Sequence, residues 1–278
     1  MLHSLDLPAR QAKPRTGGRT MVIDNGVPVG LFQDVIDSSA DLIDLVKFGW
    51  GTALVTAGIE KKISILRRHG VSFMFGGTLF EKHVHQGRFA QFRELCLNAG
   101  CDCVEVSNGT IELDPNRKAE YIAQLLPDFE VISEVGFKDQ HRSELFAPSQ
   151  WISDIQTDLR AGARSVILEA RESGTSGICR PEGEVRHGLI EDVMRADLAL
   201  DQLIFETPTK ALQTYFIKRV GPDVNLGNIA MTDVVALETL RLGLRSDTLL
   251  DLLPEVPAVP GLAGLPDPGG IGAVAVEP

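Results

Sequence analysis

The chain has 278 residues, of which 44% are hydrophobic and 23% are charged, a composition typical of a globular protein. Its formal net charge of −11 argues against a nucleic-acid-binding protein, because that function needs a basic face that displaces counterions. No apolar run reaches the ~18 residues of a membrane span, and the N-terminus lacks an apolar signal core. We therefore expect a cytoplasmic protein with no nucleic acid or membrane partner.

Strands and helices are predicted in strict alternation along the middle of the chain. Such alternation implies a parallel sheet, because each return to the same sheet needs a crossover. Eight units favour a closed (β/α)8 barrel, and no G-x-G-x-x-G follows the first strand, as an open dinucleotide-binding sheet would require. The predicted strands cover 20–24, 42–51, 71–75, 103–107, 130–135, 165–168, 203–206 and 224–228; the predicted helices cover 33–39, 59–69, 87–98, 115–126, 148–161, 187–196, 208–219 and 232–242.

The two ends of the chain differ from its middle. Residues 1–18 are polar and contain two prolines and two glycines, which predicts a flexible N-terminal arm. Residues 254–278 are rich in Pro, Gly and Ala and almost uncharged, which predicts a flexible tail. The segment between them, 19–253, has a length close to the ~250 residues typical of a single-domain (β/α)8 TIM barrel.

Some polar residues outside the strand ends have simple structural interpretations. We interpret the crowded Cys96, Cys101 and Cys103 as reduced thiols in or near the core, since they lack the spacing of a disulfide framework. The sequence of residues 76–86 predicts a glycine turn followed by a polar loop, with His83 and His85 exposed on that loop. A solvated face of the helix at 59–69 is predicted from its four cationic residues, Lys61, Lys62, Arg67 and Arg68.

Charged and amide side chains follow most of the predicted strands, where a barrel brings them to one mouth. Carboxylates at successive strand ends repel one another unless cations join them. Mg²⁺ prefers such hard oxygen ligands, and the lysines and arginine would bind an anion. These residues therefore predict a metal-assisted reaction on a phosphorylated or carboxylated small molecule: Asp24, Lys47, Glu105, Glu134, Lys138, Glu169, Arg171, Glu172, Glu206 and Asn228.

Six motifs in chain order resemble the phosphosulfolactate synthase family, over about residues 15 to 245. They are D-L-V-K-F-G-W-G-T at 44–52, G-G-T-L-F-E at 76–81, V-E-V-S-N-G-T-I-E at 104–112, I-S-E-V-G at 132–136, I-L-E-A-R-E-S-G at 167–174 and G-P-D-V-N-L-G-N-I at 221–229. The resemblance implies a (β/α)8 barrel that adds sulfite to C3 of phosphoenolpyruvate. Magnesium is the implied cofactor, and (2R)-3-phosphosulfolactate the implied product.

The resemblance also implies a proton donor, a lysine after the fifth strand, which is Lys138 here. The family pattern at this point is G-K-K, whereas this chain reads Gly136-Phe137-Lys138, so the assignment depends on the second lysine of the pattern. If the first lysine is the catalytic one, the assignment fails.

The other roles follow from residue chemistry. We expect Lys47 and Arg171 to hold anionic groups, and Glu105 and Glu134 to bind the metal, with Glu169 as a further ligand. Gly227 and Asn228, at the end of the eighth strand, are where barrels often bind phosphate through backbone N–H groups. Lys47 is also a candidate catalytic residue.

Three alternatives stay open at this point. Glu105 and Glu134 can instead form structural ion pairs with Lys47 or Arg171, and Arg171 can pair with Glu134 or Glu172. The enzyme can use phosphoenolpyruvate with a small nucleophile other than sulfite. The barrel can also be a non-catalytic, stress-related or binding relative, because a fold does not determine function. A homo-oligomer is expected in each case.

Overall fold

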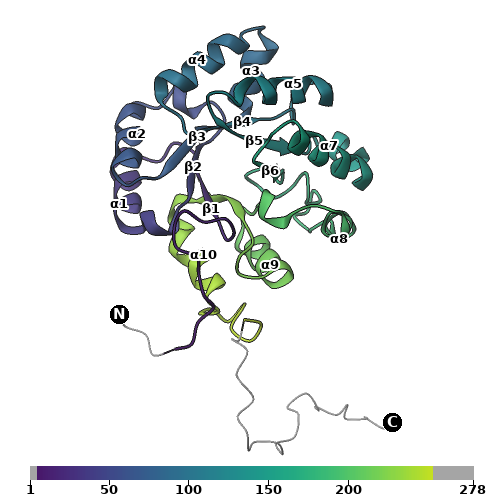
Figure 1. Cartoon of the computed structure of the whole chain (residues 1–278). Helices are drawn as coiled ribbons and strands as arrows, with labels where there is room; N and C mark the ends of the chain where they lie inside the picture. Colours follow the sequence, from purple (N-terminus) through teal and green to yellow (C-terminus); the bar gives the residue numbers. More distant parts are fainter. Residues whose placement is uncertain (1–4, 253–278) are drawn as a thin grey trace, which may run out of the picture.

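The computed structural model describes residues 5–252, which form a ring of eight strands surrounded by helices (Figure 1). The strands are β1 (Thr20–Asp24), β2 (Leu45–Phe48), β3 (Ser72–Phe75), β4 (Cys103–Val106), β5 (Glu130–Val135), β6 (Ser165–Leu168), β7 (Leu203–Glu206) and β8 (Leu226–Ala230). The helices are α1 (Val29–Ser39), α2 (Ile59–Arg68), α3 (Gly77–His85), α4 (Phe89–Ala99), α5 (Pro115–Leu125), α6 (Gln140–Leu145), α7 (Pro148–Arg160), α8 (His187–Arg195), α9 (Lys210–Val220) and α10 (Val234–Arg241).

All strand pairs are parallel, in the order β3-β2-β1-β8-β7-β6-β5-β4, so β3 and β4 are the two ends of one sheet. These ends face each other without a backbone ladder in the described structure. Two side-chain hydrogen bonds join them instead, from the Phe73 N–H to Asp102 Oδ2 (3.3 Å) and from the Cys103 thiol to the Phe73 carbonyl (3.8 Å). The sheet is therefore a nearly closed barrel, and the predicted (β/α)8 TIM barrel is confirmed.

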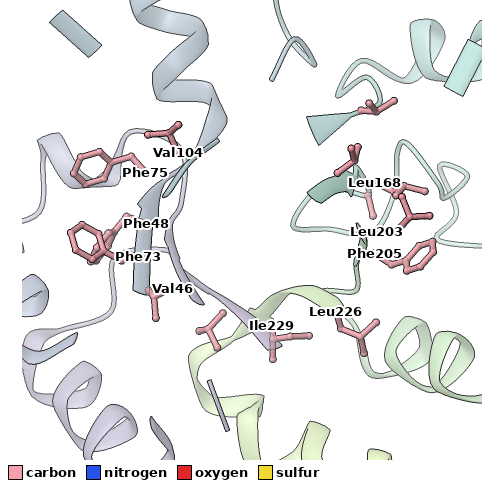
Figure 2. Packing of buried hydrophobic residues seen from close by; sticks show 14 of the residues in the cluster. Val46, Phe48, Phe73, Phe75, Val104, Leu168, Leu203, Phe205, Leu226 and Ile229 are labelled. Atoms are coloured by element: carbon pink, nitrogen blue, oxygen red, sulfur yellow. The ribbon is translucent and has the colours of Figure 1, made fainter. Parts of the chain in front are cut away.

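The core has two parts, because successive side chains of a strand point to opposite faces. Outward-facing residues such as Phe48, Phe73 and Phe205 pack between the sheet and the helices, and Figure 2 shows them pointing away from the centre of the barrel. Inside the barrel, a separate apolar layer is formed by one residue from each of seven strands: Met21, Leu45, Met74, Cys103, Ile132, Ile167 and Ile204.

Residues 5–18 contact the barrel beside α10 (Figure 1). The Arg10 guanidinium donates to Glu238 of α10 (2.9 Å), and Arg15 pairs with Asp44 before β2 (3.2 Å). These ion pairs lie at the side of the barrel where the strands begin. The tail predicted at 254–278 lies outside the described residues.

Two helices were missed by the sequence analysis, α3 and the short α6. Residues 76–86 were predicted as a turn and a polar loop, but α3 begins at Gly77 directly after β3. Leu79, Phe80 and Val84 have the spacing of one helical face, and the first two are buried. His83 is accordingly half-buried, with its Nδ1 2.8 Å from the Leu79 carbonyl oxygen. All four cysteines are buried and free, as the core-thiol interpretation predicts for those at 96, 101 and 103.

No helix in the range 5–252 combines the length and the apolar content that a bilayer crossing requires.

Lys62 was wrongly placed on a solvated face. It is fully buried, and its ammonium group lies 2.5 Å from Asp24 Oδ2 and over the Phe32 ring. Asp24 also accepts the N–H groups of Gly26 and Val27. This pair fixes α2 to the end of β1 on the helical side of the sheet, so Asp24 does not belong to the barrel mouth.

Replacing Lys62 by Met should lower the free energy of unfolding by about 3–5 kcal/mol, because it leaves the Asp24 carboxylate buried without its cation. The exposed neighbour provides a matched control: Lys61→Met should change stability by less than about 0.5 kcal/mol. Urea denaturation followed by circular dichroism measures both. Equal stability of the two variants would show that the buried pair contributes nothing.

Candidate active site

Five strands carry a charged residue two positions beyond their residue in the apolar inner layer. Lys47 follows Leu45 in this way, and four glutamates follow the inner residues of β4, β5, β6 and β7. Because side chains alternate along a strand, all five point into the barrel one level above the apolar layer. They line a hollow at the ends of the strands together with residues of the following loops: Ile23, Lys47, Trp50, Gly76, Gly77, Thr78, Glu105, Glu134, Lys138, Glu169, Arg171, Glu172, Glu206 and Asn228.

Lys47 lies at the bottom of this hollow, surrounded by carboxylates. Its Nζ is 3.1 Å from Glu206 Oε1, 3.3 Å from Glu105 Oε2 and 3.9 Å from Glu134 Oε2. Burial alone would lower the pKa of Lys47, but the charges of these neighbours outweigh it and raise the pKa. These neighbours therefore favour the charged form of Lys47, and the ion pairs considered for Glu105 and Glu134 are present.

Lys138 enters the hollow from the β5–α6 loop, with 22% of its side chain exposed. Its Nζ lies 3.0 Å from Glu134 Oε1, 3.4 Å from Glu169 Oε2 and 3.9 Å from Glu81 Oε1. Burial opposes the charge, but these carboxylates raise the pKa of Lys138 well above its ordinary value. Two ammonium groups thus approach the same carboxylate, that of Glu134, from opposite oxygens.

The pKa values of three glutamates in the hollow shift in different directions. Burial would raise the pKa of Glu134, but Lys138, Lys47 and hydrogen bonds from Glu105 and Glu169 lower it below its usual range. Burial raises the pKa of Glu105 to about 8, with the Glu134 charge adding to this and the Lys47 charge opposing it. The pKa of Glu169 is likewise raised, by burial and by the Glu134 and Glu206 charges.

Three buried oxygens at this level have no hydrogen-bond partner, namely Glu105 Oε2, Glu169 Oε2 and Asn228 Oδ1. Such oxygens are the ligands that Mg²⁺ prefers, and it usually takes only one or two carboxylates from the protein. Within residues 5–252 no group of three His, Cys, Asp or Glu residues is arranged to hold a metal by itself. The donors fit a magnesium ion that completes its shell with substrate and water. Glu105 Oε2 and Glu169 Oε2 each lie near one lysine, at 3.3 and 3.4 Å. Glu134 has a lysine near each of its two oxygens, so it is the least available ligand of the three.

Strained backbone is concentrated at the same place. Trp50, Arg171 and Asn228 are the non-glycine residues with positive φ among the described ones, at 50°, 61° and 54°, and all three line the hollow. Non-glycine residues in this region cost of the order of 1 kcal/mol or more and cluster at functional sites. At Arg171 the turn lets the backbone N–H donate to Glu169 Oε1 (2.5 Å), while the guanidinium stays 41% exposed beside Glu172.

Most of the chain matches a known protein family. The sequence model of (2R)-phospho-3-sulfolactate synthase (ComA) matches residues 8–247. The chain belongs to the phosphosulfolactate synthase family. It is 50% identical over 245 residues to phosphosulfolactate synthase of Bacillus subtilis, covering 88% of this chain and 97% of that protein. It is 39% identical over 246 residues to phosphosulfolactate synthase of Methanothermobacter thermautotrophicus, covering 87% and 95%.

Among solved structures, 3-hexulose-6-phosphate synthase superimposes with a TM-score of 0.51 at 13% identity, covering 80% of this chain and 97% of that one. At this identity the likeness shows the barrel fold alone. The phosphosulfolactate synthase resemblance of the six motifs is thus confirmed by the family match, and the fold by the structural match.

Most of the site residues predicted for this phosphosulfolactate synthase family member converge on the hollow. Lys47, Glu105, Glu134, Lys138 and Glu169 are joined by ion pairs or hydrogen bonds; Arg171 and Asn228 complete the lining. Gly227 does not line the hollow. A β-bulge between β8 and β1 turns both Gly227 and Asn228 toward the interior, but at different levels. A Cβ on Gly227 would lie 2.6 Å from the Met21 methyl group and 3.1 Å from Ile204, so this glycine belongs to the apolar layer below.

The sequence analysis gave no role to Glu81 or to the start of α3. The first residues of α3 line the hollow because Gly76 and Gly77 lack side chains: a Cβ on Gly77 would lie 2.7 Å from Glu105 Oε1. The uncapped N-terminus of α3 therefore faces the site with its positive dipole end. The G-G-T-L-F-E motif contained the signal, but helical spacing over residues 79–84 had to be recognised first.

The raised pKa of Glu105 predicts a dependence of stability on pH. The folded state keeps a proton that the unfolded chain releases near its ordinary pKa of 4.5, so this contribution is complete below 4.5 and is lost as the pH rises through about 8. Glu105→Gln has no such proton. The difference in unfolding free energy, variant minus wild type, should therefore rise between pH 5 and 8 and be flat above. Urea denaturation across this range measures it, with the exposed Glu94→Gln as control; a constant difference would contradict the assignment.

Proposed function

We propose that this chain is a magnesium-dependent enzyme that adds sulfite to C3 of phosphoenolpyruvate to give (2R)-3-phosphosulfolactate. The observation that carries the proposal is the hollow itself, in which two ammonium groups converge with three buried oxygens that accept no hydrogen bond. This combination suits a small, multiply anionic substrate together with a divalent cation. The family membership supports the choice of sulfite and phosphoenolpyruvate, because the curated relatives are named phosphosulfolactate synthases.

In the proposed reaction the sulfur lone pair of sulfite forms a bond to C3 of phosphoenolpyruvate. The C2=C3 electron pair moves toward C2 and the carboxylate, and C2 then takes a proton. Bound magnesium would supply Lewis-acid stabilisation at the substrate carboxylate, with Glu105, Glu169 and Asn228 as the residues that would hold the ion. No carbon–oxygen or phosphorus–oxygen bond breaks, so the phosphate stays on the product.

Residues of the chain would stabilise the developing charge, donate the proton and bind the phosphate. Lys47, fixed below the substrate by three carboxylates, places a permanent positive charge where negative charge builds up. Lys138 is the proton donor to C2, and Glu134 and Glu169 orient its ammonium group. Arg171 at the exposed rim can bind the phosphate bidentately, close to the dipole of α3.

The proposal predicts a product of defined mass. Incubation with phosphoenolpyruvate, sulfite and Mg²⁺ should give phosphosulfolactate by mass spectrometry, and removal of the metal with EDTA should stop turnover until Mg²⁺ is restored. Consumption of phosphoenolpyruvate with another nucleophile, but not with sulfite, would support the alternative nucleophile. Absence of any phosphoenolpyruvate-dependent reaction would support the non-catalytic relative.

Lys138→Ala should lower kcat by about 10²–10⁴-fold, the range typical of a lost general acid. Lys82, an exposed lysine of α3, provides the matched control, and Lys82→Ala should keep wild-type kcat. Far-ultraviolet circular dichroism should be the same for both variants, because Lys138 lies on a loop. A Lys138→Ala enzyme with normal kcat would assign the proton to another group.

A further inference from the structure

Glu81 is a buried carboxylate that the proposed reaction does not yet use. It lies in the second turn of α3, beside the hollow but behind its lining residues, and is 1% exposed. A buried carboxylate needs hydrogen-bond donors, since an uncompensated one costs several kcal/mol. Where these donors come from indicates what Glu81 does.

All of its hydrogen bonds come from one segment, the loop between β4 and α5. Oε2 accepts the backbone N–H groups of Thr110 (2.9 Å) and Ile111 (3.0 Å), and Oε1 accepts the Ser107 hydroxyl (2.5 Å). Glu81 therefore clamps residues 107–111 to α3. These bonds occupy both of its oxygens, whereas Glu105 Oε2 and Glu169 Oε2 accept no hydrogen bond, so Glu81 is not placed to bind a metal.

The clamped loop holds Lys138 through the backbone. The Gly109 carbonyl accepts the Lys138 N–H (3.1 Å). Gly109 can approach this closely because it lacks a side chain: a Cβ there would lie 3.2 Å from the Gly136 carbonyl and 3.5 Å from Lys138 Cγ. The second route is direct, since Glu81 Oε1 lies 3.9 Å from the Lys138 ammonium group.

We propose that Glu81 is a positioning residue, which fixes the 107–111 loop and through it the place of the Lys138 ammonium group in the hollow. The inference rests on the proposed function, in which Lys138 gives its proton to C2. Glu81 does not touch the substrate in this scheme. Its loss should therefore misplace the proton donor while leaving the groups that bind the substrate, Lys47 and Arg171, where they are.

Two substitutions separate the two routes. Glu81→Ala removes the acceptors for the loop and the charge together, and misplacement of a catalytic group by about 1 Å can lower kcat by up to ~10²-fold. Glu81→Gln keeps an oxygen that can accept the two amide N–H groups but removes the charge, so it should lose less activity. KM for phosphoenolpyruvate should stay within about twofold of the wild-type value in both. Glu94→Ala and Glu94→Gln, on the exposed side of α4, are matched controls.

Hydrogen exchange followed by mass spectrometry measures how well the amide N–H groups of the 107–111 loop are protected, independently of turnover. In Glu81→Ala the segment containing Thr110 and Ile111 should exchange faster, while α5 and the strands keep wild-type protection; in Glu81→Gln the segment should stay protected. Faster exchange with unchanged kcat would overturn the positioning role, as would wild-type exchange in Glu81→Ala. A rise in KM equal to the loss of kcat would place Glu81 in substrate binding instead.

The same experiments distinguish this inference from the proposed function. A wild-type enzyme without sulfite-dependent turnover would refute the proposed function. A wild-type enzyme that turns over, a Lys138→Ala variant that does not, and a fully active Glu81→Ala variant would refute only the role of Glu81.

Discussion

The structure depends on keeping two ammonium groups and several carboxylates together inside a barrel that excludes most water. Glutamates at the ends of β4, β5, β6 and β7, with Glu81 of α3, outnumber Lys47 and Lys138. Desolvation of so many like charges is unfavourable, and the pKa shifts reflect this: the pKa of Glu134 is lowered, and those of Glu105 and Glu169 are raised. In the proposed function, a divalent cation would balance this excess of acidic groups.

The barrel makes this arrangement possible by repeating one local pattern. An apolar inner residue followed two positions later by a charged one occurs on five strands, and parallel pairing brings the charged residues to one level. The apolar layer below them closes the barrel and keeps water from the lower side of the charges. The chemistry is then adjusted by loops: Lys138, Arg171 and the start of α3 all follow strand ends, where changes cost the fold little.

The alternation of strands and helices, and most residues of the mouth, could be predicted from the sequence because both depend on short-range patterns. Lys47 and Glu105 stand out as charges that end apolar strands. What could not be predicted is which charge meets which. The partner of Lys62 is 38 positions away, so Lys62 was placed in solvent although it stands three residues after Ile59 and four before Leu66, on the buried face of its helix. Glu81 was missed for the same reason, since its partners belong to another loop. The role of Lys138 came from family resemblance, not from spacing.

The junction between β3 and β4, the two ends of the sheet, is here called the seam. There the barrel lacks backbone pairing, and two side-chain hydrogen bonds join the strands. Above that seam Glu81, which follows β3, accepts hydrogen bonds from the loop that follows β4. A carboxylate thus replaces part of a missing ladder, at the point where a sheet with two ends is weakest. Warming should loosen this junction before the rest of the ring melts, so that the enzyme would stop working while it is still folded.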